Sequence, residues 1–151
     1  LEIAMAADIR VAKKDGGKIG LPEVGLGVLP GTGGTQRLPR IIGKAQAIEL
    51  MVTGRTFGFE EAREMGLVNA IFKADGFREQ VKEYARAFTP PNKAAKAVGH
   101  IKRCVQSGLE ASFGDGLAIE RELQQILFQS EDAKEGISAY TEKRTAKFSG
   151  D

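Results

Sequence analysis

The chain has 151 residues, of which 42% are hydrophobic and 28% are charged. This balance is typical of one ordinary globular domain and excludes long disorder. The formal net charge is only +2, from 22 basic and 20 acidic side chains, and gives no reason to expect nucleic acid as a partner. No apolar run is long enough to cross a membrane. Cys104 is the only cysteine, so no internal disulfide can form; a reducing compartment and a buried apolar role for Cys104 are expected.

The first half, residues 1–74, is rich in Gly and Pro and has short apolar runs. An Ala/Met-rich run favours a helix, and polar/apolar alternation favours a strand. Gly43 is a natural end for the helix before it. The predicted elements, in chain order, are a helix over 2–7, a strand over 8–12, a turn over 13–17, an extended piece over 18–20, a Gly-dense stretch over 23–34, helices over 35–42, 44–53 and 59–65, and a strand over 67–72.

The second half, residues 75–151, is charged and helical in period, and it contains no proline after Pro91. Apolar residues recur at helical spacing in four successive segments, and Pro90 with Pro91 ends the first of them. Helices this amphipathic need a partner surface, either the first half of the chain or another subunit. Three stripes contain Phe77, Val81, Tyr84, Ala85 and Phe88; Ala94, Val98, Ile101 and Val105; and Ile119, Leu123, Ile126 and Leu127. The last helix is marked by Ile137, Tyr140 and Arg144, and it has a basic tail of Lys143, Arg144 and Lys147.

Several collinear segments resemble one protein family. Residues 21–37 read LPEVGLGVLPGTGGTQR, residues 1–12 read LEIAMAADIRVA, residues 66–72 read GLVNAIF and residues 140–148 read YTEKRTAKF. Over nearly its whole length the chain is similar to the crotonase (enoyl-CoA hydratase/isomerase) superfamily. The resemblance implies an α/β fold, with residues 1–74 as the C-terminal part of a β-β-α spiral and residues 75–151 as a helical trimerisation region.

The same resemblance implies that two backbone N–H donors lie upstream of Leu1. In the family these donors form the oxyanion hole, and this chain contains neither. The chain is therefore expected to be the C-terminal portion of a longer protein. Because one oxyanion donor is typically worth ~10²–10³ in rate, the 151 residues alone are expected to be inactive or nearly so.

Two glutamates, Glu2 and Glu23, match the family's two catalytic carboxylates. The resemblance implies that Glu2 activates water and that Glu23 delivers a proton to carbon, which is general acid–base work. Two carboxylates that lie so near each other should raise one another's pKa, which would keep one of them protonated. For either residue the alternative role is an ordinary helix cap or a solvated side chain.

The pair favours an enoyl-CoA hydratase, which adds water reversibly to 2-trans-enoyl-CoA thioesters in fatty-acid β-oxidation or a related pathway. Enoyl-CoA isomerases of the superfamily typically keep the residue that matches Glu23 and lose the one that matches Glu2. An isomerase or another acyl-CoA activity remains the first alternative, and a non-catalytic oligomerisation module the second. The resemblance implies no cofactor, neither metal nor redox group, beyond the coenzyme A of the substrate. It also implies a homo-oligomer, a trimer or a hexamer built as a dimer of trimers, in a bacterial cytoplasm or a mitochondrial matrix.

The glycine loop after Glu23 fits neither a Walker loop nor a dinucleotide fingerprint. By resemblance, the Gly31 N–H helps to position the reacting water; the alternative is that the glycines only allow a tight turn. Arg37 is expected to be a structural anchor. The apolar residues of the loop, Val24, Leu26, Val28 and Leu29, either line an acyl pocket, with Leu26 as a substrate contact, or pack in the core, and core packing is the preferred interpretation.

Near the C-terminus, Tyr140 and Lys143 lie where family members contact the nucleotide end of coenzyme A. A lysine suits a phosphate as a compact point charge, and the alternative is a solvated basic tail. His100 has no catalytic partner in a known pattern, so a surface or interface role is expected. No cluster with metal-ligand spacing is present in the sequence.

Overall fold

The computed structural model describes residues 1–151. The chain forms two compact units, Leu1–Val81 and Lys82–Asp151. Helix α5 (Phe77–Arg86) carries the chain from the first unit into the second.

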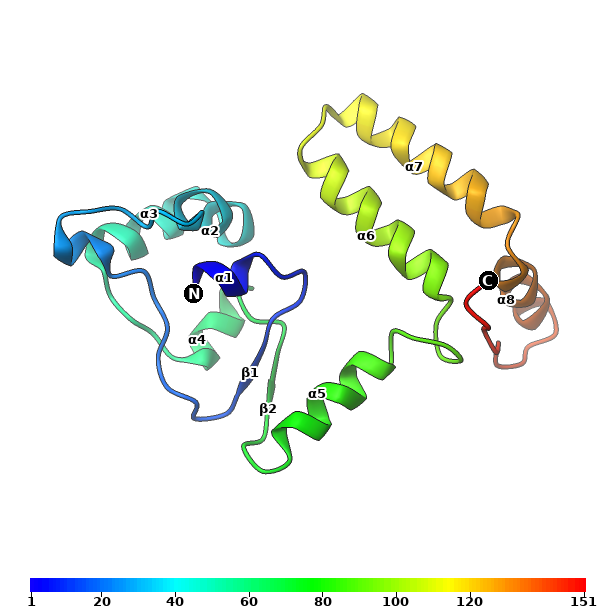
Figure 1. Cartoon of the computed structure of the whole chain (residues 1–151), viewed down its shortest axis with the longest axis horizontal. Coiled ribbons are helices and arrows are strands. Elements are labelled where there is room, and N and C mark those ends of the chain that lie inside the picture. The colour runs from blue at the N-terminus through cyan, green and yellow to red at the C-terminus, as the bar shows by residue number, and fades with distance from the viewer. The chain divides into compact units, whose positions relative to one another are not determined.

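The first unit consists of short helices around a small sheet (Figure 1). The helices predicted at 35–42, 44–53 and 59–65 are all present, and Gly43 and Gly54 end two of them at positive φ, where glycine avoids the Cβ penalty. The elements are α1 (Glu2–Met5), β1 (Val11–Lys13), the 3₁₀ helix η1 (Glu23–Leu26), α2 (Gly34–Ile42), α3 (Lys44–Thr53), α4 (Phe59–Glu64) and β2 (Ala70–Phe72).

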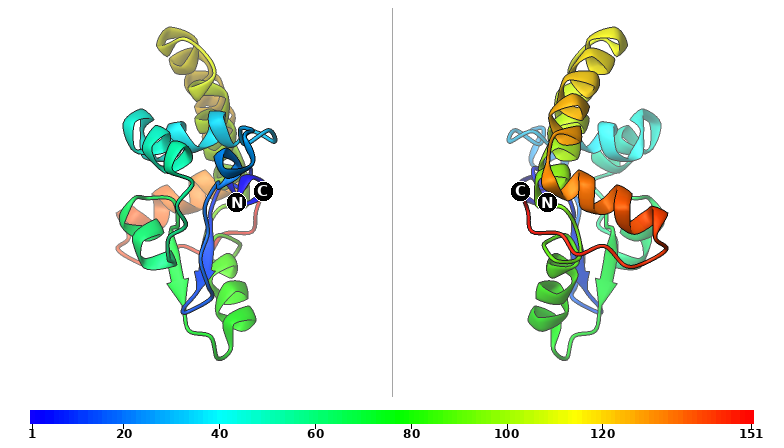
Figure 2. Two further views of the ribbon diagram at one scale, coloured as in Figure 1. Left: turned by 90° about the vertical axis from the view of Figure 1, so that its left-hand side faces the viewer. Right: turned by 90° about the vertical axis from the view of Figure 1, so that its right-hand side faces the viewer.

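The sheet contains two parallel strands, β1 and β2, which lie side by side in Figures 1 and 2. Val11 pairs with Ala70, so the first strand begins later than the predicted residue 8. The reason is a side-chain pairing just ahead of it. Arg10 N donates to Asn69 Oδ1 at 2.9 Å, and Asn69 N donates back to Arg10 O at 2.8 Å. The side-chain oxygen of Asn69 thus takes the place of a backbone carbonyl as the acceptor for Arg10 N.

A single apolar core holds these elements together. Leu38 from α2 and Leu67 before β2 are almost completely buried, and burial of such side chains is worth roughly 1.5–3 kcal/mol each. The cluster also includes Leu21, so the segment that leads to Glu23 is anchored in the core. Its buried members are Met5, Ala12, Leu21, Leu38, Ala47, Leu50, Phe57, Ala62, Leu67 and Val68.

The second unit is helical, and with α5 it confirms the four helices predicted for residues 75–151. Helices α6 (Ala95–Leu109) and α7 (Phe113–Phe128) form a hairpin, and α8 (Glu131–Thr141) follows (Figure 2). Ser112 and Ser130 cap α7 and α8, each accepting a backbone N–H from three residues ahead. Serine at this position satisfies an otherwise unpaired helix donor.

The α6–α7 hairpin leaves apolar side chains exposed along one stretch of its surface. A hollow of about 770 Å³ opens between the two helices, and His100 and Cys104 line it. Cys104, expected to be buried, is half-buried. The exposed apolar side chains of the hairpin are Ile101, Val105, Leu109, Phe113, Leu117, Ile126 and Phe128.

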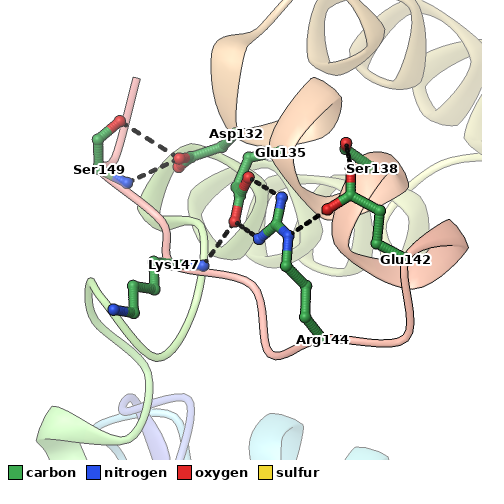
Figure 3. Close-up of polar contacts among 7 residues, drawn as sticks. All are labelled: Asp132, Glu135, Ser138, Glu142, Arg144, Lys147 and Ser149. Carbon is green, nitrogen blue, oxygen red and sulfur yellow. Dashed lines mark hydrogen bonds and ion pairs between the residues drawn. The ribbon is translucent and has the colours of Figure 1, made fainter.

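The C-terminal tail folds back onto α8 through two carboxylates (Figure 3). Asp132, only 3% exposed, accepts hydrogen bonds from the backbone N–H groups of Ser149 and Gly150. Glu135 binds Arg144 through two parallel hydrogen bonds of 2.6 and 2.8 Å. No helix of the chain combines the length and the apolar character that a membrane span requires.

Candidate active site

Three donors from one loop hold the carboxylate of Glu2, the first residue of α1. Thr32 N and Gly34 N donate to Oε1 at 2.9 and 2.7 Å, and the Thr32 hydroxyl donates to Oε2 at 2.5 Å. Gly34 is the first residue of α2, so the carboxylate sits at the N-terminus of that helix. The positive end of the helix dipole favours an anion there.

This donor set decides the ionisation of Glu2. The Thr32 hydroxyl is the main cause that lowers the pKa of Glu2 below its ordinary value, and the N–H groups of Gly34 and Thr32 add to it; partial burial opposes them. Glu23 is not among the causes that shift the pKa of Glu2, so the expected mutual effect of the two carboxylates stays a prediction. Hydrogen bonds to the carboxylate are the main causes that lower its pKa, and the charge of the N-terminal ammonium at Leu1 makes the smallest contribution.

The loop that supplies the donors is itself fixed by α2. Arg37 Nη1 donates to the Thr32 carbonyl at 2.9 Å, and Gly33 adopts a φ of 100°. A Cβ on Gly33 would lie 2.2 Å from Arg37 Nη1, so the guanidinium occupies the space that any other residue would need. Arg37 thus has the structural role expected of it, as an anchor for the loop that binds Glu2.

Gly34 brings the segment around Glu23 close to Glu2. A Cβ on Gly34 would lie 2.9 Å from Glu2 Oε1, 3.0 Å from Leu21 Cδ1 and 2.7 Å from Pro30 Cβ. Leu21 and Pro30 flank η1, the short helix that Glu23 begins. Residues on both sides of η1 therefore pack beside Glu2 at the first turn of α2.

Glu23 has surroundings unlike those of Glu2. Its Oε2 atom is buried and has no hydrogen-bond partner. A buried oxygen without a donor costs free energy in the absence of a ligand and is uncommon in folded proteins. The Gly31 N–H, in the same loop region, also makes no hydrogen bond within the chain, and a Cβ on Gly31 would meet only Leu29 O, at 3.9 Å.

The apolar residues after Glu23 are exposed, so the preference for core packing is wrong. Val24, Val28 and Leu29 line an open hollow of about 240 Å³. Leu26 lies at the end of η1, is 82% exposed and is not part of this lining. On the other side the hollow is lined by α3 residues, Ile48, Met51 and Val52.

The remaining predicted residues belong to the second unit. Tyr140 is 88% exposed, and Lys143 follows the end of α8 with a positive φ of 56°. Arg144 beside it is paired with Glu135 and Glu142, so the basic tail is only partly available to a ligand. His100 contributes an Nδ1 atom that is buried without a partner.

Comparison with known proteins agrees with the family resemblance of the sequence. The Enoyl-CoA hydratase/isomerase family model matches residues 1–151. The chain belongs to this family. A crystal structure of an enoyl-CoA hydratase from Geobacillus kaustophilus superposes with a TM-score of 0.91 at 48% identity, and it covers 99% of this chain. The crotonase fold is thereby established for the chain.

Curated members of the family are similarly close. A probable enoyl-CoA hydratase of Mycobacterium bovis is 43% identical over 97% of the chain. A short-chain-enoyl-CoA hydratase of Clostridioides difficile is 41% identical over 92% of the chain, which spans 88% of that relative. The chain spans 56% of the Mycobacterium bovis protein and 56% of the Geobacillus structure, about half the length of these family members.

Sequence reasoning missed Thr32, which contributes two of the three donors on Glu2. A signal was present, because a hydroxyl residue just ahead of a helix commonly bonds polar groups there. Its partner, 30 residues earlier in the chain, could not be identified without the fold.

Proposed function

We propose that this chain carries the two catalytic carboxylates of an enoyl-CoA hydratase. Glu2 takes a proton from water, the oxygen of that water bonds to the β carbon of a 2-trans-enoyl thioester, and Glu23 gives a proton to the α carbon. The C2–C3 double bond becomes a single bond, and the product is a 3-hydroxyacyl thioester. Exchange with solvent then returns Glu2 to its ionised form and Glu23 to its protonated form.

The contrast between the two carboxylates carries this proposal. Three donors keep Glu2 ionised, as a base requires. No donor within the chain bonds the buried Oε2 of Glu23, so Glu23 is proposed as the group that delivers the proton to carbon. The two roles thus follow from two local environments in one site.

The surroundings of Glu23 support an acyl thioester as the substrate. The hollow beside Val24, Val28 and Ile48 is apolar, which suits a hydrocarbon chain. The unused N–H of Gly31 suits the reacting water. Leu26, exposed at the end of η1, is proposed as a contact along the entry of the acyl chain.

The first test compares two proteins. One is the 151-residue chain; the other, the extended protein, is this chain preceded by the upstream part of the Geobacillus kaustophilus enoyl-CoA hydratase. Hydration of crotonyl-CoA is followed by loss of the enoyl thioester absorbance. We expect activity in the extended protein and a rate at least ~10²-fold lower in the shorter chain, because the upstream oxyanion donors are required. Inactivity of a folded extended protein would contradict the proposal.

Glu23→Gln in the extended protein tests the role of Glu23. General acid catalysis contributes typically ~10²–10⁴ in rate, so the hydration rate should fall by that factor. Glu60→Gln is the matched control, because Glu60 is an exposed glutamate in α4 and lies outside residues 32–34, the loop that binds Glu2. Near-normal hydration by Glu23→Gln would remove Glu23 from the mechanism.

An isomerase is distinguished by substrate preference. A double-bond shift needs one shuttling base, whereas hydration needs a pair, and both carboxylates are present here. We therefore expect the extended protein to act faster on 2-enoyl-CoA than on 3-enoyl-CoA. The opposite ratio would favour an enoyl-CoA isomerase.

A homo-oligomer is proposed for the second unit. Several large apolar side chains of α6 and α7 are exposed, and exposed apolar surface of this kind is typical of protein–protein interfaces. Light scattering should give a trimer or hexamer for the extended protein, and Val105→Lys should shift it toward monomer. Gln125→Lys is the control, because Gln125 is already polar and exposed. An oligomer that never hydrates crotonyl-CoA would favour the non-catalytic module.

Tyr140 and Lys143 are proposed contacts for the nucleotide end of coenzyme A. The Lys143 ammonium has no ion-pair partner within the chain, whereas neighbouring Arg144 is neutralised. Lys143→Ala should weaken coenzyme A binding a few-fold at low salt, as expected for an exposed charge pair. Calorimetry with Lys93→Ala as a control checks this, and an unchanged affinity would identify a solvated tail.

A further inference from the structure

We propose that the Thr32 hydroxyl is a positioning group that fixes the direction of the one open acceptor site on Glu2 Oε2, the site that takes the proton from water. This inference rests on the proposed function, because it concerns the same base.

The argument begins with the acceptor sites on Glu2. An ionised carboxylate offers about four sites, two on each oxygen. Both sites of Oε1 are used by the N–H groups of Thr32 and Gly34. One site of Oε2 is used by the Thr32 hydroxyl. The single remaining site, on Oε2, is left to receive a proton.

The hydroxyl also fixes the plane of the carboxylate. The terminal torsion of a glutamate is broad and has little intrinsic preference. With donors on Oε1 alone, Oε2 could swing about that anchor. Because Thr32 binds Oε1 through its N–H and Oε2 through its hydroxyl, one residue holds both oxygens and the free site keeps one direction.

Thr32 is in turn rigidly held. Its carbonyl accepts a hydrogen bond from Arg37, a residue of α2, and the next two glycines have no space for a side chain against Arg37 and Pro30. The hydroxyl is therefore presented from a loop fixed to the first turn of a helix. Groups held in this way need little reorganisation during reaction.

The test uses Thr32→Val, which removes only the hydroxyl, and Thr32→Ser, which keeps it. In the 151-residue chain, carbon-13 NMR of labelled glutamate, with the Glu2 signal assigned by Glu2→Gln, reports the Glu2 titration. Loss of the hydroxyl should raise the pKa of Glu2 in Thr32→Val, and Thr32→Ser should match the wild type. Thr53→Val, which removes a hydroxyl bonded only to backbone carbonyls of α3, should leave the titration unchanged.

The extended protein supplies a second measurement. Thr32→Val should lower kcat by about 10-fold, the usual effect of one lost hydrogen bond to a charged group, with little change in KM. The acid limb of its pH–rate profile should move to higher pH, and Thr32→Ser should restore both. If Thr32→Val leaves the Glu2 titration and the acid limb unchanged, the inference is overturned while the hydratase proposal stands. Inactivity of the wild-type extended protein would instead count against the hydratase proposal, and the NMR titration would still decide whether Thr32 controls Glu2.

Discussion

Two regions of the molecule hold carboxylates with several donors each, and they do so differently. At the first turn of α2, Glu2 is held by two backbone N–H groups and one hydroxyl, with no cation among its hydrogen-bond donors. In the tail, Glu135 is held by the guanidinium of Arg144 and the N–H of Lys147. Figure 3 shows Arg144 bonded to both Glu135 and Glu142.

The difference separates a carboxylate suited to chemistry from one suited to structure. Glu135 is neutralised by an ion pair, and its pKa is lowered to about 2, first by hydrogen bonding to Arg144. A base that weak is a poor proton acceptor near neutral pH. The hydrogen bonds that lower the pKa of Glu2 come from uncharged donors, and they leave one acceptor site open. The type of donor, and not burial alone, marks the candidate catalytic residue.

The largest expected effect comes from removing one charge in each region. In the extended protein, Glu2→Gln should lower the hydration rate by ~10²–10⁴, because an amide cannot take the proton. Its folding should be preserved, since the amide oxygen still accepts from Thr32 and Gly34. Glu135→Gln should leave the hydration rate unchanged and lower the thermal midpoint, because Arg144 loses its bidentate partner. Steady-state rates and thermal unfolding of both variants check the comparison, and reversed effects would contradict it.

Much of the first unit was predictable because its signals are local. Helical spacing and the glycine at position 43 predicted α2 and α3 correctly. The motif around Glu23 identified that residue as a candidate for the site. The strand boundary at Val11 was not predictable, because it depends on the Asn69 amide, 59 residues from Arg10. The exposure of Val24 was missed for a similar reason. The sequence pattern of a short apolar loop is the same whether its side chains pack in the core or line a hollow.

The tail network shows a second limit. Arg144 appeared in the sequence as part of a basic cluster, and its partner Glu135 lies nine residues earlier, outside the three- and four-residue spacings that join residues along a helix. Only the return of the chain after α8 brings them together. Asp132 was likewise missed, because an acidic residue in the first turn of a helix ordinarily remains in solvent.

A smaller effect is expected from Gly34→Ala, which disturbs the Glu2 region through packing. The new methyl would lie 2.7 Å from Pro30 Cβ and 2.9 Å from Glu2 Oε1, and neither the proline ring nor the bound carboxylate can move freely. Overpacking of this kind costs about 1–3 kcal/mol, and hydration should fall because Glu2 is displaced. Gly99→Ala in α6 has open space and should stabilise the helix slightly. Urea unfolding of both variants distinguishes a steric effect from a general sensitivity to alanine.

The smallest effect is the pH dependence of the tail network. The pKa of Glu135 is about 2 in the folded chain, against an ordinary value of 4.5, so folding favours the ionised form. Its stabilisation is complete above pH 4.5 and is lost as the pH falls through the folded value. Glu135→Gln should therefore be less stable than the wild type near neutral pH, and the difference should shrink as the pH approaches 2. Urea unfolding across this range measures the difference. If the difference in free energy of unfolding between the two proteins stayed constant across this range, Arg144 would stabilise the tail through packing of its side chain. The contrast with Glu2 would then rest on geometry alone.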